Sequence, residues 1–246
     1  MVNAGASNNI KKFIFFILIV LVILTSVLAY YFLIHRSGST MRSTRVIEWI
    51  RNPEKNPNWA IKAGERCDDA AFMMPTNGYI GFLWDDSFRP GHEHTGLDIF
   101  GGTDNGITPV VAAYDGYLTR QSDWKSTVII RIPSDPLQPE RQIWTYYTHM
   151  ADQQGNDFIS DEFPPGTSEV LVKAGTFLGY QGNYSGTPGN PTGVHLHFSI
   201  VKDDGTGRFL NESILENTLD PTPYFNIELN AKNSPPDIPL CSNNQN

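Results

Sequence analysis

Four of the six histidines lie in short patterns whose spacing suits metal chemistry. His94 and Asp98 frame the pattern His-Thr-Gly-Leu-Asp, and His195 and His197 lie in Val-His-Leu-His-Phe. His149, in Tyr-Tyr-Thr-His-Met, falls at the end of a predicted strand. Imidazole and carboxylate groups are common zinc ligands. A lone histidine is more often an ordinary surface or core residue, but this combination predicts a metal site.

The pair His195 and His197 has the spacing of two residues on one face of a strand. Leu196 and Phe198 would then face the core. One imidazole could bind a metal while its neighbour reaches water or substrate. His92 forms a second His-x-His with His94, and we interpret it as a loop residue.

The elements that must position these residues read as β-strands rich in Val, Ile, Tyr and Thr, separated by Gly, Pro, Asp or Asn. No alternation of strands and helices appears, so antiparallel sheets are expected. The predicted strands are Pro109–Arg120, Thr127–Pro133, Gln142–Met150, Val170–Lys173, Thr176–Gln181 and Val194–Lys202. Asp115-Gly116 is a turn signal inside the first of them.

The uncharged run from Phe13 to Ile34 is long enough for a membrane helix, since about 20 apolar residues cross the hydrocarbon core. We therefore expect a cytoplasmic leader at 1–12 and a single-pass anchor at 13–34. The alternative is a signal peptide cleaved near Ala29. A stem is expected at 35–65, with a short helix at Met41–Arg51 that carries Val46, Ile47 and Ile50 on one side.

The main domain is expected at 66–230, followed by a polar tail at 231–246. Two cysteines, Cys67 and Cys241, flank it, and they form either free thiols or one disulfide. The net charge of -8 argues against nucleic acid as a partner, because phosphate binding needs clustered Lys and Arg.

The motifs together make the chain resemble the lysostaphin and LytM-type zinc metallopeptidases, which act on peptidoglycan. The resemblance spans roughly residues 75–225. It runs in order through HTGLDI (His94–Ile99), TPVVAAYDGYL (Thr108–Leu118), YYTHM (Tyr146–Met150), VKAGTFLGYQGNYSGTPG (Val172–Gly189), GVHLHF (Gly193–Phe198) and LDPTPYF (Leu219–Phe225).

This resemblance implies that His94, Asp98 and His197 bind one zinc ion per chain, and that His149 and His195 are catalytic without being ligands. It implies a mainly β fold of antiparallel sheets forming an open groove, related to swapped-hybrid β-barrels. The implied activity is hydrolysis of peptide bonds in the stem or cross-link peptides of peptidoglycan, outside the cytoplasm.

The residues agree with this chemistry. Two imidazoles and one carboxylate leave zinc a net positive charge and an open position, which is typical of catalytic sites. No His-Glu-x-x-His helix supplies a glutamate base, so His195 or His149 would take the proton from water. The sequence leaves open which of the two does so.

The Gly-rich run Gly179–Gly193 is interpreted as a loop beside the metal, where small residues let a substrate backbone approach. Asn183 and Tyr184 are candidate substrate contacts within it. The connection between His149 and Val170 is longer than usual in the family, and we interpret it as a surface insertion at the edge of the groove.

Two other functions fit parts of the sequence. A non-catalytic wall-binding or amidase-activating protein could keep the same fold, but the complete residue set argues against it. A phosphocarrier or lipoyl-type domain shares the segment before the Gly-rich hairpin. The apolar N-terminal run and the His-x-x-x-Asp pattern argue against that class.

Overall fold

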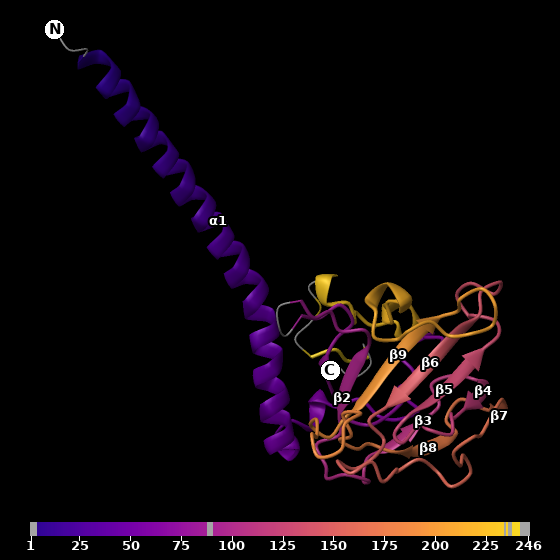
Figure 1. Cartoon of the computed structure of the whole chain (residues 1–246). Helices are drawn as coiled ribbons and strands as arrows, with labels where there is room; N and C mark the ends of the chain where they lie inside the picture. The colour runs from indigo at the N-terminus through magenta and orange to yellow at the C-terminus, as the bar shows by residue number, and fades with distance from the viewer. Residues whose placement is uncertain (1–3, 88–90, 234, 236–237, 242–246) are drawn as a thin grey trace. The chain divides into compact units, whose positions relative to one another are not determined.

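Antiparallel β-sheet dominates the computed structural model, which describes residues 4–87, 91–233, 235 and 238–241, without the side chains of 4–10 and 31–41. The strands are β1 (Tyr79–Phe82), β2 (Leu97–Phe100), β3 (Pro109–Val111), β4 (Gly116–Thr119), β5 (Val128–Ile132), β6 (Ile143–Thr148), β7 (Val170–Val172), β8 (Phe177–Tyr180) and β9 (Leu196–Lys202). Seven form one sheet in the order β1-β2-β9-β6-β5-β4-β7, and β3 pairs with β8. The expected fold class, mainly β with antiparallel sheets, is confirmed (Figure 1).

Two features of the sheet differ from the sequence prediction. The expected strand over 109–120 is divided into β3 and β4, because the chain bends at Ala113–Asp115 around the predicted turn. The strands β1 and β2 were not expected, since each is only four residues long. β2 begins three residues after His94, so the predicted chemical motif and the missed strand overlap in sequence.

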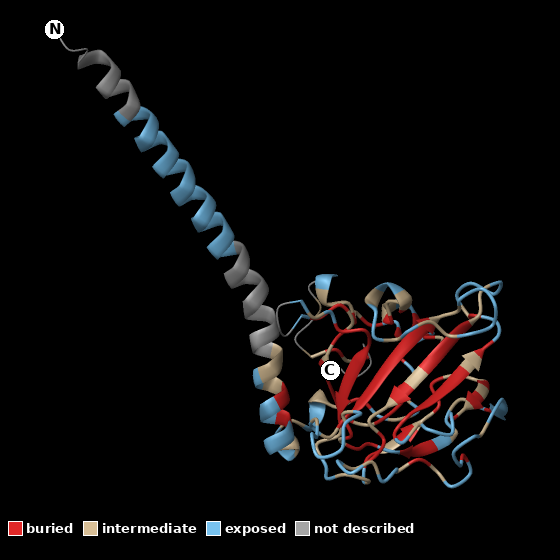
Figure 2. Ribbon diagram, in the orientation of Figure 1, coloured by how far each residue is buried: buried red, intermediate tan, exposed pale blue. Residues whose placement is uncertain are grey.

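The pairing of β2 with β9 places the functional residues opposite one another. Asp98 on β2 is the register partner of His197 on β9, and Thr148 at the end of β6 is the partner of His197 on its other side. Leu196 and Phe198 point into the main core, as the strand period predicts. The ladder thus brings together residues that lie 99 positions apart in the chain. Figure 2 shows that the central strands are largely buried.

The N-terminal helix α1 runs from Ala4 to Arg51. Its segment Lys11–Tyr30 is long and apolar enough to cross a membrane, a test that a signal sequence near an N-terminus also passes. The remaining helices are short: the α-helix α2 (Thr222–Phe225) and the 3-10 helices Pro53–Lys55, Pro57–Trp59, Leu215–Asn217 and Ala231–Asn233.

The compact unit that carries the sheets begins at Arg42, so it includes part of the segment suggested as a stem. The last turns of α1 pack within this unit, but through a different side of the helix from the one that the sequence predicts. Val46 and Trp49 are buried in a cluster with Tyr79 and Phe100. Ile47 and Ile50 are exposed, which corrects the predicted apolar side. Trp49 is preferred inside because its indole N–H finds an acceptor there.

A disulfide joins Cys67 to Cys241. Of the two alternatives that the sequence left open, the disulfide is therefore present. Both cysteines belong to the main hydrophobic core, so part of the expected polar tail returns to the domain.

Candidate metal centre

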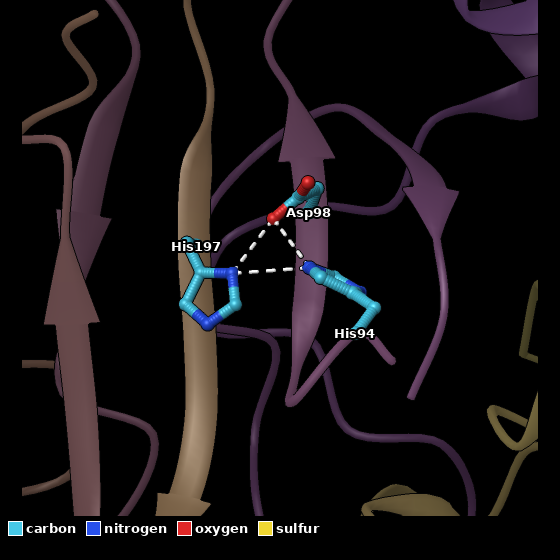
Figure 3. Close-up of side chains that lie close together, drawn as sticks. All are labelled: His94, Asp98 and His197. Carbon is cyan, nitrogen blue, oxygen red and sulfur yellow. Dashed lines mark hydrogen bonds and ion pairs between the residues drawn. The ribbon is translucent and has the colours of Figure 1, made fainter. Parts of the chain in front are cut away.

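Three buried side chains converge on one point beside the β2–β9 ladder (Figure 3). His94 Nε2 lies 3.0 Å from Asp98 Oδ1 and 3.1 Å from His197 Nδ1, and His197 Nδ1 lies 2.8 Å from Asp98 Oδ1. Asp98 and His197 come from paired strands, and His94 comes from the segment that leads into β2. These are the three residues that the sequence predicts as ligands, and the structure brings them together.

The outer nitrogens of the two imidazoles determine where their protons lie. His94 Nδ1 is 2.8 Å from the carbonyl oxygen of Leu83, and His197 Nε2 is 2.8 Å from Glu212 Oε1. Each partner is an acceptor, so each outer nitrogen must donate its N–H. The inner nitrogens of the neutral rings therefore turn lone pairs toward each other and toward the Asp98 carboxylate.

Three acceptors that face one another repel unless a cation lies between them. Donor atoms about 2 Å from a tetrahedral zinc ion are about 3.3 Å apart, close to the observed separations. His94, Asp98 and His197 therefore could hold a metal ion, and two nitrogens with one oxygen form a donor set suited to zinc.

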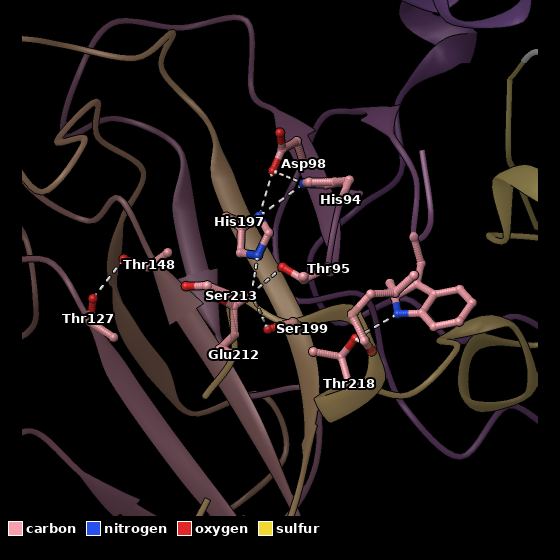
Figure 4. A network of polar contacts seen from close by, with 12 residues as sticks. His94, Thr95, Asp98, Thr127, Thr148, His197, Ser199, Glu212, Ser213 and Thr218 are labelled. Carbon is pink, nitrogen blue, oxygen red and sulfur yellow. Dashed lines mark hydrogen bonds and ion pairs between the residues drawn. The ribbon is translucent and has the colours of Figure 1, made fainter. Parts of the chain in front are cut away.

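Glu212 completes the surroundings of His197, and sequence analysis missed it (Figure 4). Besides the His197 N–H, its Oε1 atom accepts hydrogen bonds from the hydroxyls of Thr95, at 2.7 Å, and Ser199, at 3.0 Å. Such a carboxylate orients a ligating histidine and increases its basicity. Glu212 lies in a loop with no periodic pattern, so no local signal in the sequence identifies it.

The carboxylates control the charge of the centre. Burial lowers the pKa of His197, but Glu212 and Asp98 outweigh it and raise this pKa to about 10. Burial raises the pKa of Asp98, but the imidazoles of His94 and His195 hold it well below its usual value. In the metal-free protein at neutral pH His197 is therefore protonated, and its inner lone pair becomes available only when this proton leaves. A metal ion must displace it.

The two predicted catalytic histidines lie beside the cluster. His195 Nδ1 donates to the carbonyl oxygen of Gly193 at 2.7 Å, and its Nε2 lies 3.5 Å from Asp98 Oδ1. His149 Nδ1 donates to the carbonyl oxygen of Tyr184 at 2.6 Å. The ring centroids of His149 and His195 are 4.5 Å apart. His195 Nε2 therefore faces the carboxylate of the candidate ligand Asp98, and the His149 ring lies against the His195 ring.

His149 has an unusual backbone conformation, with φ of 72°. Such a left-handed residue is strained by about 1 kcal/mol or more and is typical of functional positions. Gly182 packs so closely on this segment that a Cβ atom there would come 2.5 Å from the His149 carbonyl oxygen. Burial, then the neighbouring His195 and His197, lower the pKa of His149 to about 3, so the ring is neutral at pH 7.

A pocket of about 470 Å³ adjoins the cluster at His197. His149, His197 and Tyr184 contribute to its lining, as does Glu212. Of the two predicted substrate contacts, Tyr184 thus reaches the pocket. Asn183 does not line it, and its buried Oδ1 has no hydrogen-bond partner among the described residues. His92 stacks on His94 with centroids 6.5 Å apart and is not one of the three converging residues.

No family model matches the chain, and no curated protein matches it by sequence. Among solved structures, it is similar to the antimicrobial peptidase lysostaphin from Staphylococcus simulans, with 17% identity and a TM-score of 0.38 over 68% of this chain and 55% of that one. It is similar to LytM from Ruminococcus gnavus, with 28% identity and a TM-score of 0.34 over 53% of this chain and 45% of that one.

A third similar structure is the catalytic domain of the prophage-encoded protein EnpA from Enterococcus faecalis, with 20% identity and a TM-score of 0.34. That match covers 62% of this chain and 95% of the other. The chain spans about half the length of the LytM and lysostaphin chains. Their names are those of the family that the sequence motifs resemble.

Proposed function

We propose that this chain is a zinc-dependent endopeptidase that hydrolyses peptide bonds in the stem or cross-link peptides of peptidoglycan. The observation that carries the proposal is the convergence of two imidazole nitrogens and one carboxylate oxygen at separations of 2.8–3.1 Å. Two further histidines beside them, each oriented by a backbone carbonyl, supply groups for proton transfer.

Zinc bound by His94, Asp98 and His197 would supply Lewis acidity, which polarises a peptide carbonyl and makes water a stronger acid. The chain's own part is to move protons. Hydrolysis needs one proton removed from the attacking water and one delivered to the leaving amine as the C–N bond breaks. His149 and His195 divide these two transfers, since a carbonyl oxygen fixes one nitrogen of each ring and leaves the second nitrogen to exchange a proton.

We further propose that the domain works outside the cytoplasm and that α1 anchors it. The segment Lys11–Tyr30 supports a membrane span, and the disulfide between Cys67 and Cys241 supports an oxidising compartment. Protease added to spheroplasts of an expressing bacterium should then digest the domain without lysis. Protection until lysis would place the domain inside.

The activity is tested by mass analysis of fragments released from defined peptidoglycans by the full chain purified in detergent. New free amino termini should appear, should disappear after treatment with a chelator, and should return when zinc is added. Stoichiometric zinc without any released fragment would favour the non-catalytic wall-binding alternative. Cleavage that persists after complete zinc removal would overturn the proposal.

The division of roles is tested by His149→Ala and His195→Ala. Each variant should still bind one zinc ion, while turnover falls by about 100-fold or more. His197→Ala serves as the contrast, because it should lose zinc as well. Loss of zinc from the first two variants would mean that they are ligands or supports of the metal site.

A further inference from the structure

We propose that the last turns of α1, Arg42–Arg51, position the proposed catalytic centre through two separate contacts. Arg42 supports the segment that holds the ligand His94. Trp49 supports Phe100, which packs behind the catalytic candidate His195. The inference rests on the proposed zinc-dependent function, and it adds a role for residues that no chemical motif contains.

The first contact is a two-pronged ion pair. Arg42 Nε and Nη2 donate to the two carboxylate oxygens of Asp86 at 2.7 and 2.9 Å. The Asp86 side chain is only 2% exposed, so its charge depends on this partner. A planar guanidinium also sets the direction of the carboxylate, which a point charge would not do.

The segment 83–86, which contains the Arg42 partner Asp86, forms three hydrogen bonds with His94. The backbone N–H of His94 donates to the carbonyl oxygen of Asp86 at 2.9 Å, and its own carbonyl oxygen accepts from the N–H of Asp85 at 2.8 Å. The His94 ring donates to the carbonyl oxygen of Leu83 at 2.8 Å. Displacement of this segment would therefore move the Nε2 atom that faces the metal position.

The second contact leads to the other histidine. Trp49 Nε1 donates to the carbonyl oxygen of Phe100 at 2.6 Å, in a buried position. Phe100 is the last residue of β2, and its ring stacks on His195 with centroids 5.0 Å apart and planes 24° apart. Tyr79, the register partner of Phe100, packs against the Trp49 ring. Trp49 thus fixes the aromatic surface on which His195 rests.

The two contacts make different predictions, because one ends on a ligand and the other on a proton-transfer group. Simple loss of stability would affect both readouts together. Specific positioning should separate the two readouts. A substitution of Arg42 should weaken zinc binding, whereas a substitution of Trp49 should lower turnover while zinc stays bound.

The Arg42 contact is tested by zinc titration of the full chain in detergent against a chromophoric competitor. Arg42→Met should bind zinc about tenfold more weakly than the wild type. Its matched control is Arg51→Met, which removes the same charge from an exposed position of the same helix. If Arg42→Met does not fold, Arg42→Lys keeps the charge without the fork and should show about a threefold loss. Equal affinities for the Arg42 variants and the Arg51 control would overturn this contact.

The Trp49 contact is tested by Trp49→Phe, which keeps an aromatic ring but removes the N–H. We expect kcat to fall about fivefold to tenfold, with zinc affinity within about twofold of the wild type. The matched control is Trp144→Phe, which removes an indole N–H that bonds Asp203 away from the centre. Equal kcat values for these two variants would overturn this contact.

Failure of this inference is distinguishable from failure of the proposed function. Wild-type protein that binds no zinc and cleaves nothing would refute the function itself. Wild-type protein that binds zinc and cleaves, with both test variants matching their controls, would refute only the positioning role of Arg42–Arg51.

Discussion

Two of the buried polar clusters among the described residues differ in how their hydrogen-bond donors and acceptors are matched. In the first, Asp135 accepts hydrogen bonds from the guanidinium of Arg141 and from the hydroxyl of Tyr224, and the Leu137 N–H donates to its other oxygen. Every contact pairs a donor with an acceptor. In the second, formed by His94, Asp98 and His197, removal of the proton from His197 leaves three acceptors facing one another.

The difference shows how a functional cluster can be recognised. Burial and proximity are common to both groups, and both contain an aspartate with strong partners. The Asp135 cluster is complete without any added species, so it supports the fold. The Asp98 cluster needs a proton or a metal ion at its centre, so it is open to ligand chemistry. The same substitution in each cluster should therefore have different consequences.

The largest effect is expected for Asp98→Asn, which keeps the shape of the side chain but removes its charge. Zinc content should fall below stoichiometric amounts, and hydrolysis should fall by about 1,000-fold or more, because the ligand set loses its only anion. Metal analysis and fragment release measure the two effects. Full zinc content with normal cleavage would show that the comparison assigns the wrong role to this cluster.

The matched substitution Asp135→Asn should act on stability. It leaves Arg141 and Tyr224 without their anionic acceptor, and we expect the free energy of unfolding to fall by about 2 kcal/mol. The loss is moderate because the Arg141 side chain is 32% exposed and keeps access to water. Denaturant unfolding measures this, while the zinc affinity of the folded protein should be unchanged. A loss of zinc affinity would mean that the two clusters are coupled.

A smaller effect is expected for Glu212→Gln. Glu212 is the anion behind His197, so its neutralisation should weaken zinc binding by about tenfold. The control is Glu216→Gln, an identical change at an exposed glutamate four residues away. If competition titrations give the same zinc affinity for Glu212→Gln and Glu216→Gln, the charge of Glu212 does not contribute to zinc binding.

The comparison is sharpened last without any substitution, by the pH dependence of zinc binding. Because the pKa of His197 is raised to about 10 in the metal-free protein, binding must release one proton at lower pH. Zinc affinity should therefore rise by about tenfold per pH unit as pH increases toward 10, and level off above it. Calorimetry at pH 7 in buffers of different ionisation enthalpy should report about one proton released per zinc. No proton release would mean that His197 is already neutral.

Much of the centre could be predicted from sequence because its residues lie in local patterns. The strand period places His195 and His197 on one side of a strand, and the short spacing from His94 to Asp98 keeps both near the start of β2. The central strands were recognisable from their β-branched and aromatic residues. No local pattern predicts that Asp98 lies opposite His197, because this position depends on the pairing of β2 with β9.

The rest depends on contacts between segments that are distant in sequence. Glu212 has no periodic neighbours, and only its three bonds to Oε1 identify it. Around residues 46–50 the helix offers apolar residues on more than one side. The choice of Trp49 over Ile47 and Ile50 follows from an acceptor on β2, which helix periodicity cannot reveal.

The disulfide has a consequence for resistance to proteolysis. Cys67 and Cys241 enclose every residue of the centre, and the exposed loop 186–191 lies between them. A foreign protease that cuts this loop once would leave two fragments joined by a covalent bond, with His94 and His197 on different fragments. The fragments could not diffuse apart, so a nicked molecule would retain the parts it needs to remain assembled.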